Sequence, residues 1–207
     1  MRIIIWITTT KTRHNYIYWM LEQLKEMWFS DDDIRIFDDD WSYWLIKNKQ
    51  RCFRETLRVA EKINWMALIL EDDILFCKNF KQELVMAINN TWTPIISLFT
   101  RQKHIINKSF LWVAEWCFKR GFYEQAILWR CNFELYEACW KYYESNLKFT
   151  MPIERQKHHD VILQDFMVEN WIKWSITMPT LVEHIWVISS MKHQVWKSIL
   201  FIDNVKK

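Results

Sequence analysis

Residues 66–76 read Met-Ala-Leu-Ile-Leu-Glu-Asp-Asp-Ile-Leu-Phe, and this stretch decides the fold class that we predict. An apolar run typical of a buried strand ends in three carboxylates, Glu71, Asp72 and Asp73, and apolar residues then resume. Ionised carboxylates beside a core are costly unless a metal ion, another cation or several donors compensate them. Open α/β sheets bind ligands at the carboxyl ends of their strands. A divalent cation holding a diphosphate suits hard oxygen ligands placed there. We interpret the triplet as a metal and nucleotide site. The alternative is a solvated acidic turn, which the apolar flanks disfavour.

Apolar periodicity on both sides of this stretch predicts alternating strands and helices. Strands are expected at 2–8, 34–37, 66–70, 95–99, 125–128 and 175–178, and helices at 14–27, 47–62, 79–89, 132–145 and 159–169. Residues 101–122 show no regular pattern and predict a loop that closes over a bound ligand. Such alternation indicates an α/β fold with a mainly parallel central sheet and helices on both faces. Since no linker or repeat interrupts it, we expect one Rossmann-like domain over 1–207.

Composition excludes several classes of protein. The net charge is +3 and no dense basic stripe occurs, so we expect no nucleic-acid partner. The apolar run at the N-terminus is too short for a signal peptide or a transmembrane segment. An odd number of cysteines, with no CxxC pair and no secretory signal, indicates reduced thiols and a cytoplasmic protein. These cysteines stand at positions 52, 77, 117, 131 and 139.

The balance of glycine and tryptophan is unusual. The chain has one glycine, Gly121, and fifteen tryptophans, whereas about 7% glycine is average, or roughly fourteen residues here. Several tryptophans stand where glycine is expected, after a helix or after asparagine in a turn, and a bulky residue at positive φ is strained. Our hypothesis is that some UGA codons, translated here as Trp, mean glycine in the source. The alternative is a genuinely Trp-rich chain. The positions concerned are Trp28, Trp41, Trp65, Trp171 and Trp186.

Polar residues after the first predicted strand form a second candidate group. Thr8, Thr9 and Arg13 supply hydroxyls and a guanidinium, which suit a nucleotide base or a phosphate. The alternative is that this segment caps the helix that follows.

Three further residues are candidates on weaker grounds. Asp160 stands near the start of the helix predicted at 159–169, where it suits a helix-capping acid, a general base at a cleft edge, or both. Gln125 begins a predicted strand beside a possible ligand. His184 follows the last predicted strand in a polar-flanked loop. It is a candidate contact to a diphosphate or a metal, against the alternative of an ordinary core or surface histidine.

Taken in order, these motifs resemble the GT-A glycosyltransferases, especially small bacterial and viral members. The resemblance covers most of the chain. It consists of Thr8-Thr9 with Arg13, the Glu71-Asp72-Asp73 triplet, a Gln125-Ala126 strand, an acid at a helix start, and the ending Pro179-x-Leu-Val-x-His184-x-x-x-x-Ser-Ser. Trp186 departs from the pattern, because that position of the ending is usually glycine.

The resemblance implies transfer of a sugar from a nucleotide-diphosphate sugar, with a UDP-sugar as the first donor to consider, to a hydroxyl of a glycan or another acceptor. It places the enzyme among hexosyl- or N-acetylhexosaminyl-transferases that use Mn²⁺ or Mg²⁺. Asp73 and His184 would be metal ligands, and Glu71 and Asp72 would face the ribose or the metal's waters. Asp160 would be the base of an inverting reaction.

Two alternatives remain open at this point. A nucleotidyltransferase can use a similar sheet and carboxylates, but no Gly-rich phosphate loop with a lysine is visible. A catalytically silent module that binds sugar nucleotides or glycans would also need such a site, and donor hydrolysis would distinguish it from an enzyme.

Overall fold

The computed structural model describes residues 2–10, 13–27, 29–39, 45–99, 113–116, 126–130, 133–146, 159–185 and 201. The strands are β1 Ile3–Thr10, β2 Ile34–Asp39, β3 Met66–Glu71, β4 Ile74–Phe76, β5 Ile95–Ser97, β6 Val113–Trp116, β7 Ala126–Arg130, β8 Trp174–Thr177 and β9 Val182–His184. The helices are α1 His14–Glu26, α2 Leu45–Lys62, α3 Phe80–Asn89, α4 Phe133–Asn146 and α5 His159–Glu169, with a 3₁₀ turn at Asp31–Asp33.

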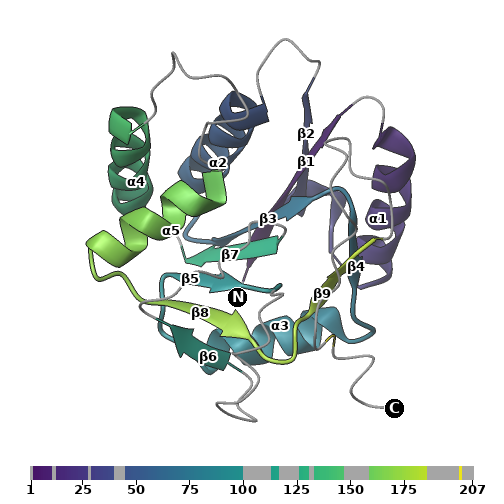
Figure 1. The fold of residues 1–207 in the computed structure, drawn as a ribbon. Coiled ribbons are helices and arrows are strands. Elements are labelled where there is room, and N and C mark those ends of the chain that lie inside the picture. Colours follow the sequence, from purple (N-terminus) through teal and green to yellow (C-terminus); the bar gives the residue numbers. More distant parts are fainter. Residues whose placement is uncertain are drawn as a thin grey trace.

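One seven-stranded sheet organises these elements (Figure 1). Its strand order is β2-β1-β3-β7-β5-β8-β6, and β4 and β9 form a separate two-stranded sheet. β1 pairs in parallel with β2 and β3, and β5 pairs in parallel with β8. β7 is antiparallel to β3 and β5, and β6 is antiparallel to β8. Within the seven-stranded sheet, all strands except β6 and β7 therefore run the same way, which confirms the mainly parallel sheet predicted from the sequence.

Helices cover both faces of the sheet, as the alternation of elements predicted. Side chains of β1 alternate between the faces, so that Ile5 and Ile7 enter one core and Ile4 and Trp6 the other. The first core is completed by α1, α3, β4 and β9, and the second by α2, α4 and α5. Figure 1 shows the latter three helices grouped on one side.

Three short strands were not predicted. β6 lies within 101–122, the segment expected to be irregular, and the rest of that segment lies outside the described residues. β4 and β9 have three residues each, too few for a two-residue periodicity to be recognised. No helix in the described part of the chain is long and apolar enough to cross a membrane.

Backbone angles test two of the positions at which glycine was expected. Trp171 has a φ of 56°, as the hypothesis predicts, and 76% of its surface is exposed. At the other Asn-Trp pair the expectation was wrong, because Asn64 takes the positive φ of 53° in place of Trp65. Asparagine tolerates this conformation through local hydrogen bonding of its short side chain. The remaining positions, Trp28, Trp41 and Trp186, lie outside the described residues.

We predict that Trp171→Gly stabilises the protein by about 1 kcal/mol, because it relieves a bulky, largely exposed residue at positive φ. Trp129→Gly is the matched control, since Trp129 is fully buried and its loss should cost about 3–5 kcal/mol or more. Urea denaturation of both variants measures the difference. A destabilised Trp171→Gly variant, or a UGG codon at position 171, would remove that residue from the recoding hypothesis.

Candidate functional site

The acidic triplet lies where two core strands meet. β3 ends at Glu71 and β4 begins at Ile74, so Asp72 and Asp73 form the connection between them. Leu70 and Ile74, on either side, are completely buried, and Asp72 and Asp73 are only 2% and 4% exposed. The apolar flanks therefore hold both carboxylates inside the protein. This excludes the solvated acidic turn.

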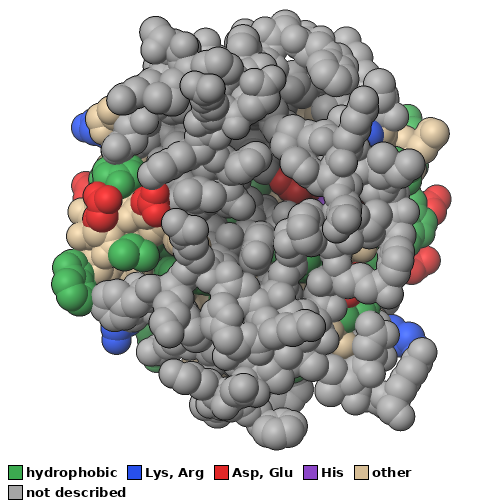
Figure 2. Space-filling model, in the orientation of Figure 1, with side chains coloured by type: hydrophobic (Ala, Val, Ile, Leu, Met, Phe, Trp, Pro, Cys, Tyr) green, Lys and Arg blue, Asp and Glu red, His purple; other side chains and the backbone are tan. Residues whose placement is uncertain are grey.

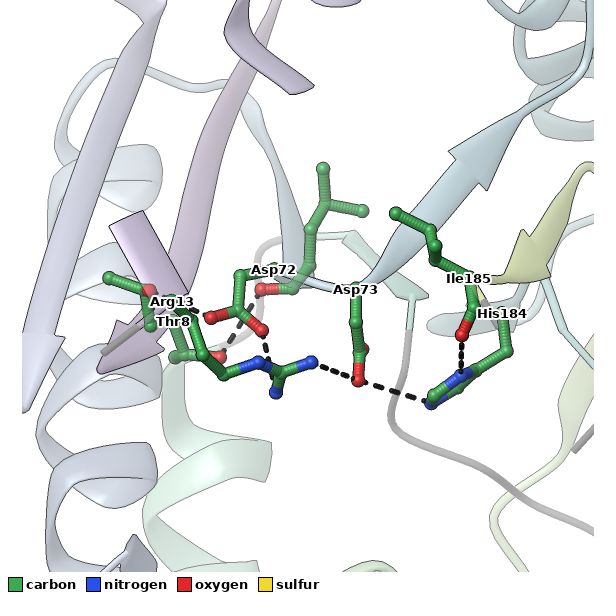
Figure 3. Close-up of polar contacts among 8 residues, drawn as sticks. Thr8, Arg13, Asp72, Asp73, His184 and Ile185 are labelled. Carbon is green, nitrogen blue, oxygen red and sulfur yellow. Dashed lines mark hydrogen bonds and ion pairs between the residues drawn. The ribbon is translucent and has the colours of Figure 1, made fainter. Parts of the chain in front are cut away.

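One guanidinium compensates both buried carboxylates (Figure 3). Arg13 directly precedes α1. Its Nη1 lies 2.9 Å from Asp72 Oδ1 and its Nη2 lies 2.5 Å from Asp73 Oδ2. Burial by itself would lower the pKa of Arg13, but the charges of Asp73 and Asp72 outweigh burial and raise it. Arg13 is therefore a firmly charged bridge across the triplet.

The hydroxyls at the end of β1 contact β3 and the residue that follows it. Thr9 Oγ1 donates to Asp72 Oδ2 at 2.7 Å, and Thr8 Oγ1 donates to the carbonyl of Leu70 at 3.3 Å. The capping alternative finds no support among the described side chains, because Arg13 at the N-cap of α1 makes no side-chain capping bond. Thr8 and Thr9 thus join the acidic site, and Thr9 helps to hold Asp72 beside Arg13.

The pairing of β4 with β9 brings His184 to Asp73. Ile74 lies opposite His184, and the N–H of Ile185 donates to the carbonyl of Asp73 at 2.7 Å. His184 Nε2 then lies 3.3 Å from Asp73 Oδ2. We expected His184 in a loop, but it is the last residue of β9 and is 7% exposed. A short strand holds it more firmly than a loop would.

The second ring nitrogen of His184 fixes the orientation of the imidazole. Nδ1 lies 3.0 Å from the carbonyl oxygen of Ile185, and because a carbonyl only accepts, Nδ1 carries a proton. Nε2 is therefore the nitrogen turned toward Asp73, as Figure 3 shows. Metal-binding histidines are commonly oriented by such a bond to a backbone carbonyl.

The residues present fit a divalent cation. Glu71, Asp73 and His184 each offer one ligand atom, and these atoms lie within 4.8 Å of one another. Ligands on opposite sides of such an ion are about 4–5 Å apart. Asp73 Oδ1 is buried and has no hydrogen-bond partner among the described residues, so a strong acceptor is left for a cation. Carboxylate oxygens suit Mg²⁺, Ca²⁺ and Mn²⁺, and an imidazole nitrogen suits transition metals.

The sequence analysis did not single out His14 and Asp38, a pair that lies next to the acidic site. His14 Nε2 lies 2.9 Å from Asp38 Oδ2, and the register of β1 with β2 places Asp38 beside Thr9. Asp38 Oδ1 is buried without a hydrogen-bond partner among the described residues. The signal was present in the sequence, because Asp38 ends a predicted strand as Glu71 does. Polar side chains therefore lie at the carboxyl ends of three neighbouring strands, β3, β1 and β2.

The other predicted site residues are only partly placed. α5 begins at His159, so Asp160 is in its first turn as predicted, although its side chain lies outside the described part. Gln125 also lies outside the described residues. β7 begins with the next residue, Ala126, which pairs with Leu70 at the carboxyl end of β3. The roles of Asp160 and Gln125 stay predictions.

A separate basic hollow lies on α2. Its volume is about 290 Å³, and Arg51, Arg54, Glu55 and Arg58 line it. Arg54 is paired with Glu137 of α4 at 3.0 Å. None of the acidic-site residues lines this hollow.

In the space-filling view, carboxylate and histidine atoms are visible near the middle of the face drawn (Figure 2).

Comparison with known proteins shows a fold that the chain shares with a solved structure. No family model and no curated protein match the chain. Among solved structures, A197 from STIV is similar with a TM-score of 0.50 and 10% identity, over 97% of this chain and 96% of that one. A glycosyltransferase involved in the glycosylation of the major capsid of PBCV-1 has a TM-score of 0.40 and 12% identity, over 86% and 94%. The first likeness shows the fold alone. The second adds a distant glycosyltransferase neighbour, at a similarity too low to decide the activity.

The buried position of Asp72 predicts a dependence of stability on pH. Burial raises its pKa to about 6, opposed by Arg13 and Thr9 and reinforced by Asp73 and Glu71. Because this pKa exceeds the unfolded value of 3.8, the native state binds the proton more tightly. The contribution of Asp72 to the free energy of unfolding must therefore fall as pH rises from about 4 through about 6.

We predict that Asp72→Asn gains stability relative to the unsubstituted protein as pH rises from about 4 to about 7, by about 1–3 kcal/mol. Urea denaturation at several pH values without divalent cations measures this. A difference between the two proteins that stays constant with pH would contradict the raised pKa.

Proposed function

We propose that this protein is a metal-dependent glycosyltransferase that moves a sugar from a nucleotide-diphosphate sugar to a hydroxyl of a glycan or another acceptor. The observation that carries the proposal is the buried Asp73 Oδ1, which has no hydrogen-bond partner among the described residues and belongs to a three-residue cluster with Glu71 and His184. The cluster lies at the carboxyl end of β3, where open α/β sheets bind ligands.

The charges of the site favour a cation together with a diphosphate. Three neighbouring carboxylates, compensated by Arg13, would repel an anionic ligand unless a divalent cation were also bound. When bound, the cation would offset the negative charge that develops on the leaving diphosphate. Arg13 presents a planar set of donors that matches phosphate oxygens. A UDP-sugar is the first donor to test, with Mn²⁺ as the first metal.

Asp160 is the base in this proposal. A carboxylate in the first turn of α5 is stabilised in its ionised form by the helix dipole. It would take the proton of the acceptor hydroxyl, which then attacks the anomeric carbon in line with the departing diphosphate. One such displacement inverts the anomeric centre. We further propose a cytoplasmic location, with which the buried Cys52, Cys77 and Cys139 agree, since they form no disulfide among the described residues.

Asp73→Asn should abolish Mn²⁺-dependent hydrolysis of a UDP-sugar, by at least about 100-fold, while far-UV circular dichroism stays unchanged because asparagine keeps the shape of the side chain. Asp32→Asn is the control, since Asp32 is an exposed acid in the 3₁₀ turn. Its turnover should equal that of the unsubstituted protein.

Near-normal turnover by Asp73→Asn would remove the triplet from the reaction. If the unsubstituted protein binds Mn²⁺ and UDP-sugars but never turns them over, it is a binding module. A screen of donors by thermal shift in Mn²⁺ comes first, because a donor at 100 times its dissociation constant stabilises by about 2.7 kcal/mol.

Asp160→Asn should lower sugar transfer by about 10²- to 10⁴-fold and leave donor affinity unchanged, because a general base acts in the transition state. Asp165→Asn is the comparison, because Asp165 lies one helical turn further along α5. Asp165 would be the general base if Asp160 proves only to stabilise the helix start. NMR of the product gives the anomeric configuration. A retained configuration would exclude the single displacement, whatever either variant does.

A further inference from the structure

One oxygen of Asp73 is shared by two groups. Asp73 Oδ2 lies 2.5 Å from Arg13 Nη2 and 3.3 Å from His184 Nε2. Arg13 therefore occupies the carboxylate that belongs to the candidate metal cluster of Glu71, Asp73 and His184. Figure 3 shows Arg13 and His184 approaching Asp73 from opposite sides.

Two cations on one carboxylate oppose each other. A divalent ion bound to Asp73 would be within a few ångströms of the Arg13 guanidinium, and this region is shielded from water because Asp73 is 4% exposed. Like charges at such a separation repel strongly when solvent screening is weak. A metal ion and the contact between Arg13 and Asp73 must therefore weaken each other.

Arg13 can leave Asp73 without leaving the site. Its Nη1 is held separately by Asp72 Oδ1 at 2.9 Å, and Asp72 is itself held by Thr9 Oγ1 at 2.7 Å. Its side chain makes no capping bond to α1 that would have to break. A small rotation about the Asp72 contact would thus release Nη2, with its hydrogen-bond donors, beside the metal cluster.

We propose that Arg13 is an exchangeable counter-ion that neutralises Asp73 when no metal is bound and transfers its Nη2 to the donor diphosphate when the metal binds. This inference rests on the proposed function. Arg13 then lowers the affinity for the metal alone and raises the affinity for the diphosphate in the presence of metal. Metal and donor binding are coupled through this one side chain.

Binding of Mn²⁺ alone, measured by electron paramagnetic resonance without a nucleotide, tests the first half. Arg13→Gln keeps hydrogen-bonding capacity but removes the charge, so it should bind Mn²⁺ about 10-fold more tightly than the unsubstituted protein. Arg35→Gln is the control, because Arg35 contacts only backbone carbonyls of Asp31 and Ile34 among its described hydrogen bonds. Its Mn²⁺ affinity should stay unchanged.

Binding of UDP at saturating Mn²⁺, measured by calorimetry, tests the second half. Arg13→Gln should bind UDP about 10-fold more weakly, because the charge-assisted hydrogen bond from Nη2 to the diphosphate is lost. The two affinities thus move in opposite directions in a single variant. A residue with only a structural role would weaken both.

Each outcome decides the inference. Equal Mn²⁺ affinity in Arg13→Gln and the unsubstituted protein overturns it and leaves the proposed function standing. If only Arg13→Gln binds Mn²⁺, the inference is supported. If neither Arg13→Gln nor the unsubstituted protein binds Mn²⁺, both the inference and the metal site are overturned. If Arg13→Gln does not fold, Arg13→Lys decides, because one ammonium cannot span both carboxylates as a guanidinium does. Its Mn²⁺ affinity should rise about threefold, and no rise overturns the inference.

Discussion

The burial of two adjacent carboxylates between two core strands is the constraint on which the rest of the site depends. β3 and β4 are anchored by completely buried apolar residues, so the turn between them cannot move out into water. Compensating groups must instead come to the turn, from the end of β1, the start of α1 and the end of β9. Asp72 and Asp73 thereby tie together segments that are far apart in the sequence, and any ligand must take part in the same balance of charge.

The sheet topology explains why these groups can meet. Parallel pairing of β1 with β2 and β3 brings three strand ends to one edge, so Thr9, Asp38 and the triplet become neighbours. The separate β4–β9 pair then adds a histidine from the other end of the chain. The sheet supplies a rigid frame, and the chemistry is set by the side chains that extend just beyond it.

The sequence predicted most of the long elements, because their apolar periodicity extends over many residues. It also placed the triplet at a strand end, because apolar runs flank it. It could not show that Arg13 bridges Asp72 and Asp73, since that contact spans 60 residues and depends on how β1 and β3 pair. The strand that holds His184 was missed for lack of length. The Asn64-Trp65 turn was assigned to the wrong residue, because either residue of such a pair can take the positive φ.

The charge pattern of the site argues for a binding role over a purely structural one. Replacing a buried ion pair with well-packed apolar residues is often neutral or stabilising, so such a pair is a poor device for stability alone. Here the compensation is also incomplete, because Asp73 Oδ1 has no hydrogen-bond partner among the described residues. His184 is meanwhile oriented by a backbone carbonyl so that its other nitrogen faces the same carboxylate. A buried oxygen without a hydrogen-bond partner destabilises a protein that binds no ligand at that oxygen. The same oxygen, beside an oriented imidazole, can serve as a ligand for a cation. These features suit a ligand that brings positive charge, such as a metal ion that Glu71, Asp73 and His184 could hold.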